Sequence, residues 1–378
     1  MAEVLLTVSG VIDPARPGQV AAGERPRADY FEMARAWDAD LLDYAAARRE
    51  TGRVGRWLER AGGPDLTLAW ACFQRRSRYR VIFTDGEQVG IPLAWLLKFL
   101  GGRRRPRHLM IVHVLSVRKK EVFLDYFGVQ SHIDTFFVYA TRQKQFIESR
   151  WHVPPERVVF TPFMVDTRFF APDALPEKKA AGEPGNVMPE TAGRAARNTQ
   201  HAKAGTPPIP MICAVGLERR DYPTLIEAVR GLDVQLIVAA GSPWSKRADT
   251  TTGQEIPPNV TVRRFNQYEL RQVYADSRFL VMPLYDVDFQ AGVTAILEAM
   301  AMERAVICSR TLGQTDVIVA GETGLYVPPG DPAALRNAIQ TLLDHPAQAE
   351  ALGRAGRRLV EAEMSLDRYV ARLKHHVS

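Results

Sequence analysis

Residues 290–309 read QAGVTAILEAMAMERAVICS, and the apolar segment AILEAMAM within them holds one lone glutamate, Glu298. A charge among apolar neighbours needs a partner or a cavity. Gly292 and Thr294 precede it at an expected helix start, where free N–H groups and the helix dipole favour phosphate. A carboxylate one to two turns further along can accept both hydroxyls of a ribose. The alternative is a buried helix whose glutamate pairs with an arginine, and the stretch alone leaves both open.

The size and composition of the chain indicate a globular protein and argue against a disulfide-rich or membrane-spanning one. Its 378 residues, 46% hydrophobic and 24% charged, indicate a globular protein of two domains. Its three cysteines are odd in number and far apart, which favours reduced structural thiols over a disulfide frame or zinc site. No apolar run is long enough to span a bilayer, and MAEVLLTVSG carries Glu3 and is typical of a strand, not of a signal peptide. We expect a cytoplasmic protein.

Positive charge is concentrated in residues 48–120, which hold seventeen Lys and Arg against five Asp and Glu. Such a region suggests an anionic partner. GIPLAWLLKFLGGRRRPRH joins an apolar helix to arginines: either a peripheral membrane element, or a core helix that ends in a solvated loop. Nucleic acid is not expected, because no aromatic and basic interleaving accompanies the charge. The arginines that could meet an anionic membrane are Arg75, Arg76, Arg78, Arg103, Arg104, Arg105 and Arg107.

Short β-rich runs alternate with helical patterns, which predicts βαβ units and parallel sheets. After residue 209 the expected strands are PMICAVG, VQLIVAA, VTVRRF, FLVMPL, AVICS and GLYVPP, and the helices YPTLIEAVRGL, YELRQVYADS, VTAILEAMAM and DPAALRNAIQTLLD. The first half is less regular. Its expected strands are EVLLTVS, YRVIFTD, HLMIVHV, TFFVYA and RVVFTP, and its helices ADYFEMARAW, EQVGIPLAWLLKFLGG and TRQKQFIESRW.

The alternation predicts an α/β fold of two Rossmann-like, doubly wound domains that face each other across a cleft. The first domain spans residues 1–171 and the second 209–364, and a flexible linker over 172–208, rich in Pro, Gly and Ala, joins them. A C-terminal helix over 365–378 either stays with the second domain or crosses back to the first. The C-terminal region is helical throughout, with Gly353 and Gly356 as weak points. Open parallel sheets bind ligands at the carboxyl ends of their strands, so the cleft is the expected site.

Five segments in order carry a resemblance to a known family. They are HLMIVHV, VPPERVVFTPFMVDTRFFAP, AVGLERRDYPTLIEAV, QAGVTAILEAMAM and GETGLYVPPGDPAAL. Together they resemble the family-four retaining glycosyltransferases of the GT-B fold (group 1 type), and the resemblance covers nearly all of the chain. It implies that the first domain faces the acceptor and that the second binds a nucleotide sugar.

The resemblance assigns roles to residues around the donor. Glu298 matches the glutamate that holds the nucleotide ribose, and Gln290 stands where a first glutamate usually contacts the donor sugar. This is a departure, since an amide can hydrogen-bond sugar hydroxyls but cannot act as a carboxylate. Arg220 matches the lysine that neutralises the leaving diphosphate, a task that suits a guanidinium. Arg219 can substitute for the family's second basic residue.

Further residues of the donor site follow from the same match. The backbone at Gly292 and Val293, with the Thr294 hydroxyl, is expected to seat the diphosphate. Phe265 or Tyr268, in the segment where the family cradles the base, is expected to stack on it.

Two residues are expected on the acceptor side. His113 ends the strand HLMIVHV, and the resemblance places it near the donor sugar and the reacting hydroxyl, although a lone histidine is more often a core residue. Gly10 is the one glycine in a first loop where the family usually has two.

The resemblance implies that a sugar passes from a nucleoside-diphosphate donor, UDP-sugar on family frequency, to a hydroxyl of a lipid-linked or glycan acceptor. No metal or other cofactor is expected, and the acceptor attacks from the face that the phosphate leaves, so configuration is retained. Two alternatives stay open: a GT-B epimerase acting on the nucleotide sugar itself, and a catalytically weak nucleotide-sugar-binding scaffold, which Gln290 permits. The expected location is cytoplasmic, either free or peripheral on the inner face of the membrane.

Overall fold

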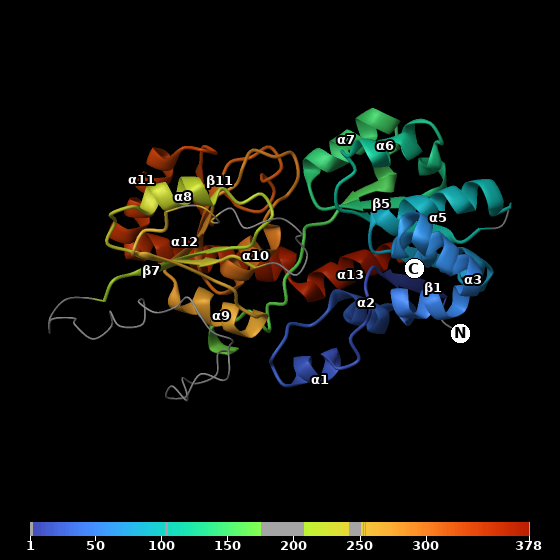
Figure 1. The fold of residues 1–378 in the computed structure, drawn as a ribbon, viewed down its shortest axis with the longest axis horizontal. Coiled ribbons are helices and arrows are strands. Elements are labelled where there is room, and N and C mark those ends of the chain that lie inside the picture. Colours follow the sequence, from blue (N-terminus) through green and yellow to red (C-terminus); the bar gives the residue numbers. More distant parts are fainter. Residues whose placement is uncertain are drawn as a thin grey trace.

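The computed structural model describes residues 3–102, 105–174, 208–241, 251, 253 and 255–377. Two α/β domains lie side by side, each built on a six-stranded parallel sheet (Figure 1). The predicted α/β fold with two doubly wound domains is therefore confirmed. Most of the predicted linker, together with Arg103 and Arg104, lies outside the described residues.

The first sheet has the strand order β2-β1-β3-β4-β5-β6. Its strands are β1 (Val4–Val8), β2 (Ala39–Asp43), β3 (Val81–Thr84), β4 (Arg107–Val112), β5 (Thr135–Val138) and β6 (Val158–Phe160). The helices are α1 (Arg16–Ala21), α2 (Asp29–Trp37), α3 (Tyr44–Gly62), α4 (Pro64–Arg75), α5 (Glu87–Leu100), α6 (Arg118–Asp125) and α7 (Thr141–Trp151). The sequence predicted all of these strands except the edge strand β2, and it did not predict α1, α3, α4 or α6.

The second sheet has the order β12-β11-β10-β7-β8-β9. Its strands are β7 (Met211–Val215), β8 (Gln235–Ala239), β9 (Val260–Arg263), β10 (Phe279–Met282), β11 (Ala305–Ser309) and β12 (Gly324–Val327). The helices are α8 (Tyr222–Val229), α9 (Gln267–Asp276), α10 (Val293–Ala301), α11 (Pro332–Asp344) and α12 (Pro346–Leu359). All six strands and the four predicted helices form where the alternation placed them.

Both faces of each sheet are buried. Since successive residues of a strand point to opposite faces, neighbouring residues of one strand join different apolar clusters. In β7, Ile212 and Ala214 join one apolar cluster, and Cys213 and Val215 join the other. In the first domain the cores contain aromatic side chains, such as Phe83 and Phe137, whose ring centroids are 5.7 Å apart. Strands that are buried on both faces are continuous apolar runs, which is why they could be predicted from the sequence.

The C-terminal helix α13 (Leu366–Val377) packs against α2 of the first domain. Figure 1 shows this helix, in red, among the blue elements of that domain. The hydroxyls of Tyr369 and Tyr139 lie 3.0 Å apart in the shared core. The chain thus returns to its first domain. The second domain is therefore connected to the first by the segment before it and by the segment after it.

The prediction that Gly353 and Gly356 weaken the C-terminal helix is wrong. Both lie inside the continuous helix α12 and are buried. A Cβ atom on Gly353 would lie 2.1 Å from the carbonyl oxygen of Glu303, and one on Gly356 would lie 3.2 Å from the Met300 side chain. These glycines are close-packing positions that let α12 approach the end of α10.

Within the described residues, no helix is both long and apolar enough to cross a bilayer. The three cysteines, Cys72, Cys213 and Cys308, are buried and free.

Candidate active site

The start of α10 lies where β10 ends, at the carboxyl edge of the second sheet. Gly292 is the N-cap residue with φ +81°, a left-handed conformation that favours glycine, and no side chain caps the helix. A Cβ atom at this position would lie 2.8 Å from the Met282 sulfur and 3.1 Å from two guanidinium nitrogens of Arg220. Glycine therefore lets Arg220 lie directly at the helix N-terminus. Val293 and Thr294 form the first turn there, with Val293 buried and Thr294 exposed.

Arg220 is held firmly in this position and is only 4% exposed. Its Nε donates to the carbonyl of Val215 at 2.7 Å, and its Nη1 donates to the carbonyl of Glu218 at 2.6 Å. Both acceptors are neutral, so these bonds orient the guanidinium without cancelling its charge. Burial lowers the pKa of Arg220 from its ordinary value. A positive group and a helix N-terminus thus converge on one point, an arrangement suited to an anion.

Glu298 lies in the second turn of α10 and is 6% exposed. It accepts a hydrogen bond of 2.8 Å from the hydroxyl of Tyr274, a fully buried residue of α9. Burial raises its pKa to about 7, and the bond from Tyr274 opposes the shift. Neither reading of the sequence predicted this partner: the buried glutamate pairs with a tyrosine and not with an arginine.

Three loops beside the helix start carry buried polar atoms that lack hydrogen-bond partners among the described residues. They are Gln290 Oε1, Thr311 Oγ1, Gln314 Oε1 and Arg219 Nε. The Gln314 amide donates to the carbonyl of Ala291 at 2.6 Å, which ties two of these loops together. Buried polar atoms rarely lack partners, so their concentration here indicates a place where a ligand supplies them.

A hollow of about 390 Å³ lies at the same loops and is lined by Arg219, Asp286, Val287, Asp288, Phe289 and Leu312. Its volume is within the range of small-molecule sites. Arg219 has φ +57°, and its Nε lies 3.9 Å from the carboxylate of Glu218, beyond hydrogen-bonding distance. The hollow adjoins Gln290, the predicted contact to a donor sugar.

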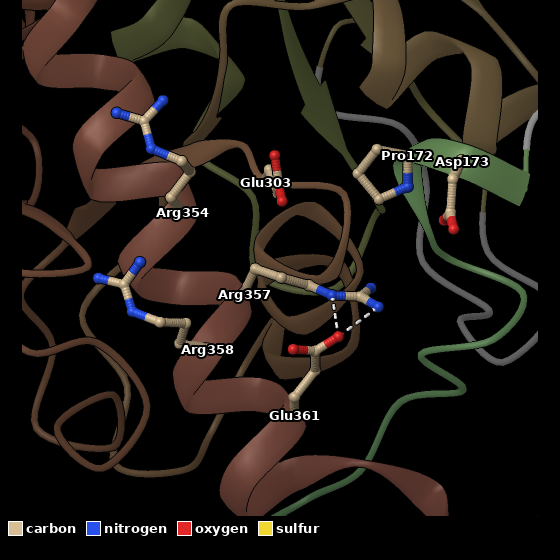
Figure 2. Close-up of a pocket in the computed structure, with 7 residues that line it drawn as sticks. All are labelled: Pro172, Asp173, Glu303, Arg354, Arg357, Arg358 and Glu361. Carbon is tan, nitrogen blue, oxygen red and sulfur yellow. Dashed lines mark hydrogen bonds and ion pairs between the residues drawn. The ribbon is translucent and has the colours of Figure 1, made fainter.

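A second hollow, of about 380 Å³, lies at the opposite end of α10 (Figure 2). It is lined by Pro172, Asp173, Glu303, Arg354, Arg357, Arg358 and Glu361. Arg357 pairs with Glu361 at 2.6 Å and donates to the carbonyls of Phe170 and Ala301. This arginine therefore binds the last carbonyl of α10 and the segment that leaves the first domain, so we assign it a structural role.

The expected base-binding residues lie near α9. Tyr268 is exposed, and the buried guanidinium of Arg271 lies 5.0 Å from its ring centroid and 4.4 Å from that of Phe169. Phe265 is partly buried, with Arg263 at 5.3 Å from its ring. Arg271 was not predicted as a site residue, since nothing in the sequence distinguishes it from a solvated helix residue.

On the first domain, His113 directly follows β4 and is exposed. Its Nε2 lies 3.0 Å from the carbonyl oxygen of Asp85, which can only accept, so Nε2 carries the hydrogen. The Asp85 carboxylate accepts from the hydroxyls of Thr7 at 2.5 Å and Ser9 at 2.9 Å. Burial raises the pKa of Asp85, and these hydrogen bonds oppose the shift.

Glu87 completes this polar cluster and is only 2% exposed. It accepts from the backbone of His113 at 2.8 Å and from the ammonium of Lys120 at 2.6 Å. Asp85 and Glu87 were not predicted from the sequence, although two acidic residues directly after a strand, in DGE, were an available signal. Gly10 lies in the loop after β1, where a Cβ atom would meet nothing within 4 Å, so this position does not require glycine.

The two domains touch at one end of α7. The helix begins at Thr141 after Ala140, which provides no side-chain cap. Asp316 of the second domain accepts from the Thr141 backbone at 2.9 Å and from its hydroxyl at 2.7 Å. A carboxylate from one domain thus caps a helix of the other, and it stands two residues after Gln314.

Most described arginines of the expected basic surface bond within the chain. Arg75 pairs with Glu50, Arg76 lies 3.9 Å from the ring centroid of Phe73, Arg105 pairs with Asp134 at 2.6 Å, and Arg107 donates to the carbonyl of His376 at 3.0 Å. Arg78 is exposed. Arg103 and Arg104 lie outside the described residues, so the described arginines form no open, continuous patch.

Comparison with known proteins agrees with this architecture. The family model described as "Glycosyl transferases group 1" matches residues 212–345. D-rhamnosyltransferase WbpZ of Pseudomonas aeruginosa is 28% identical over 131 residues, 34% of each chain. The putative colanic acid biosynthesis glycosyltransferase WcaL of Salmonella typhimurium is 26% identical over 213 residues, 52% of this chain and 51% of its own. The matched segments thus span about half or less of these relatives.

Solved structures match the whole chain. Sucrose-phosphate synthase from Thermosynechococcus elongatus has a TM-score of 0.67 at 20% identity and covers 99% of this chain and 97% of its own. HepE of Anabaena in complex with UDP and glucose has a TM-score of 0.65 at 11% identity and covers 100% and 99%. The chain therefore has the two-domain GT-B fold, and residues 212–345 of its second domain match the model of the group 1 glycosyltransferases, the family that the sequence motifs resemble.

Proposed function

We propose that the protein is a retaining, metal-independent glycosyltransferase that moves a sugar from a nucleoside-diphosphate donor to a hydroxyl acceptor. The observation that carries the proposal is the convergence of the Arg220 guanidinium and the N-terminus of α10, with Glu298 in the next turn. The family match and the glycosyltransferase relatives support the activity. The UDP held by HepE of the same fold supports UDP as the nucleotide.

Each part of the donor has a place in this arrangement. The diphosphate rests on the backbone at Gly292 and Val293 against Arg220, and Glu298 accepts the ribose hydroxyls while Tyr274 holds its carboxylate. The base lies toward Tyr268. The sugar occupies the hollow of about 390 Å³, which Arg219 lines, and Gln290, which follows the lining residue Phe289, hydrogen-bonds its hydroxyls.

The chemistry follows from where charge develops. As the bond between the sugar carbon and the diphosphate oxygen breaks, negative charge grows on the leaving group, and Arg220 and the helix N-terminus stabilise it. These fixed positive groups serve in place of a metal. The acceptor hydroxyl attacks on the face from which the diphosphate departs, so configuration is retained, and its proton passes to the diphosphate. His113, at the edge of the facing sheet, contacts the donor sugar and the reacting hydroxyl.

Location and acceptor belong to the same proposal. We place the protein in the cytoplasm, peripheral on the inner face of the membrane, with a lipid-linked or glycan acceptor. Its buried, free thiols accord with a reducing compartment. The described basic residues of the arginine-rich surface are largely engaged within the chain, so the membrane contact must be sought elsewhere on the first domain.

Calorimetry with UDP, GDP and ADP, followed by a panel of their sugars, tests the proposal. We expect binding of at least one diphosphate, and transfer of its sugar to an added hydroxyl acceptor. Conversion of the donor without any acceptor would instead identify an epimerase. Tight binding without turnover on any acceptor would identify a scaffold, and absence of binding would refute the proposal.

A further inference from the structure

An exposed apolar surface lies on the first domain, where the end of α5 meets α6 (Figure 1). We call it the aromatic surface, and its residues are Phe99, Leu100, Val122, Phe123, Tyr126 and Phe127. Tyr126 is 82% exposed and Phe99 49%. Single exposed apolar residues are ordinary, but a contiguous group of them marks an interaction site.

The aromatic surface is built by helical spacing. Val122 and Tyr126 are four residues apart, and so are Phe123 and Phe127, so they share one face of α6 and of the turn that follows it, whereas Leu124 is buried in the core. The ring centroid of Phe127 lies 5.8 Å from that of Phe123 and 6.4 Å from that of Phe99. These contacts join the two elements into one continuous surface.

Basic side chains flank the aromatic surface. Arg118 and Lys119 begin α6, are exposed, and make no ion pair with any described residue. Lys98 donates to the carbonyls of Phe127 at 2.7 Å and Gly128 at 2.9 Å, which fixes the end of α6 against α5. Aromatic rings with adjacent cations match the boundary between acyl chains and anionic headgroups.

We propose that the aromatic surface docks the protein on a bilayer that contains anionic lipid. The rings enter the headgroup boundary, and Arg118 and Lys119 meet the phosphates. The pairing of exposed aromatic rings with unengaged cations favours this occupant, because such rings sit at the headgroup level of a bilayer and nearby Lys and Arg are attracted to anionic lipid.

The position of α6 gives the contact a consequence for the acceptor; this step rests on the proposed function. Lys120, in the same turn as Arg118 and Lys119, binds Glu87, and Glu87 also accepts from the backbone of His113. The membrane-facing helix is thus tied directly to the residues around the proposed acceptor site. We infer that the acceptor is held by the bilayer and reaches His113 from the side of α6.

Flotation of the full chain with vesicles tests the docking. The vesicles are phosphatidylcholine alone, or phosphatidylcholine with phosphatidylglycerol, each at low and high salt. The test variants are Phe123→Ser with Tyr126→Ser, and Arg118→Ser with Lys119→Ser. The matched control is Arg76→Ser with Arg78→Ser, which removes two arginines from another surface.

We expect wild-type protein to float with anionic vesicles at low salt. Because each basic residue near such a surface contributes roughly fivefold in affinity, the Arg118 and Lys119 pair should weaken binding by roughly thirtyfold and flatten the salt dependence. The aromatic pair should lower binding to both vesicle types, and the control should float as wild type does. Unchanged thermal unfolding and UDP binding would show that the variants are folded.

Three outcomes would overturn the inference. Wild-type protein that stays wholly unbound at low salt would show that there is no membrane contact. Loss of flotation only in the Arg76 and Arg78 control would move the contact to the arginines. Concentration-dependent self-association that the aromatic variant abolishes would show a second copy of the chain as the occupant. Vesicle binding needs no nucleotide, so its failure is distinguishable from failure of the glycosyltransferase proposal.

Discussion

The protonation of Glu298 should control donor binding between pH 6 and 8. The carboxyl group is buried against Tyr274, and burial raises its pKa to about 7. If the ionised carboxylate accepts both ribose hydroxyls, the protonated form must lose its proton before it can bind in this way. Donor affinity should therefore rise with pH until Glu298 is fully ionised.

The magnitude follows from that pKa. One pH unit below it, about one molecule in eleven carries the ionised group, and one unit above it nearly all do. Affinity for a nucleotide sugar should thus be about tenfold weaker at pH 6 than at pH 8, or about 1.4 kcal/mol. A nucleotide sugar is the right ligand, because neither of its phosphates bears a terminal ionisable hydroxyl that titrates in this range.

Calorimetry at several pH values provides the assay, with two variants. Glu298→Gln should bind the donor more weakly at pH 8 and lose most of the pH dependence. Tyr274→Phe removes the bond that favours the ionised form and should move the midpoint to higher pH. A Glu298→Gln protein with the wild-type pH profile would refute the assignment of the ribose to this residue.

The free energy of unfolding should fall as pH rises, whereas donor affinity should rise. The folded chain retains the Glu298 proton between pH 4.5 and about 7, whereas the unfolded chain releases it near 4.5. Stability from this group is therefore full below pH 4.5 and falls as pH rises toward 7. Above pH 7 Glu298→Gln should exceed wild type by up to about 3 kcal/mol, a gap that chemical denaturation at pH 5 and pH 8 would measure.

Other residues give further tests. Arg220→Ala should lower donor affinity by at least about tenfold and, because one buried and one partly buried carbonyl lose their donor, reduce stability by about 1–3 kcal/mol in denaturant titrations; undiminished affinity would contradict its role. Asp316→Ala removes the cap of α7 and should weaken the contact between the domains by about 1 kcal/mol. Small-angle scattering with UDP bound should then show a wider envelope; an unchanged envelope would show that the cap does not hold the domains. Gly353→Ala should reduce the free energy of unfolding by about 1–3 kcal/mol and so lower the melting temperature, since its Cβ would meet a backbone oxygen; the matched Gly18→Ala, with nothing within 4 Å, should not.

The fold was legible from the sequence wherever strands are buried on both faces. The inner strands of the second sheet have this character and appeared as apolar runs, whereas its edge strands β9 and β12 are only partly buried. Residues 39–75 were not legible for two physical reasons. The edge strand β2 is only partly buried, and α3 contains Gly52, at φ +56°, and Gly55, which interrupt the helical pattern.

The candidate site was only partly legible. Gly292 and Glu298 stood out because glycine and a lone carboxylate are rare in an apolar helix start. Tyr274, which binds Glu298, lies 24 residues away and looks like any core aromatic in the sequence. Contacts that depend on how two distant elements pack, such as Asp316 with Thr141, leave no periodic signal in either segment.

The central claim is that this chain breaks the bond between a sugar and a nucleoside diphosphate at the start of α10. The most direct measurement is release of nucleoside diphosphate from a panel of nucleotide sugars, with and without hydroxyl acceptors, by wild type and by Glu298→Gln. We predict acceptor-dependent release from at least one donor, lowered at least about tenfold in the variant, since a charge-assisted contact is worth roughly 1.5–3 kcal/mol. A folded wild-type protein that neither binds nor cleaves any donor, or a variant with full activity, would contradict the account.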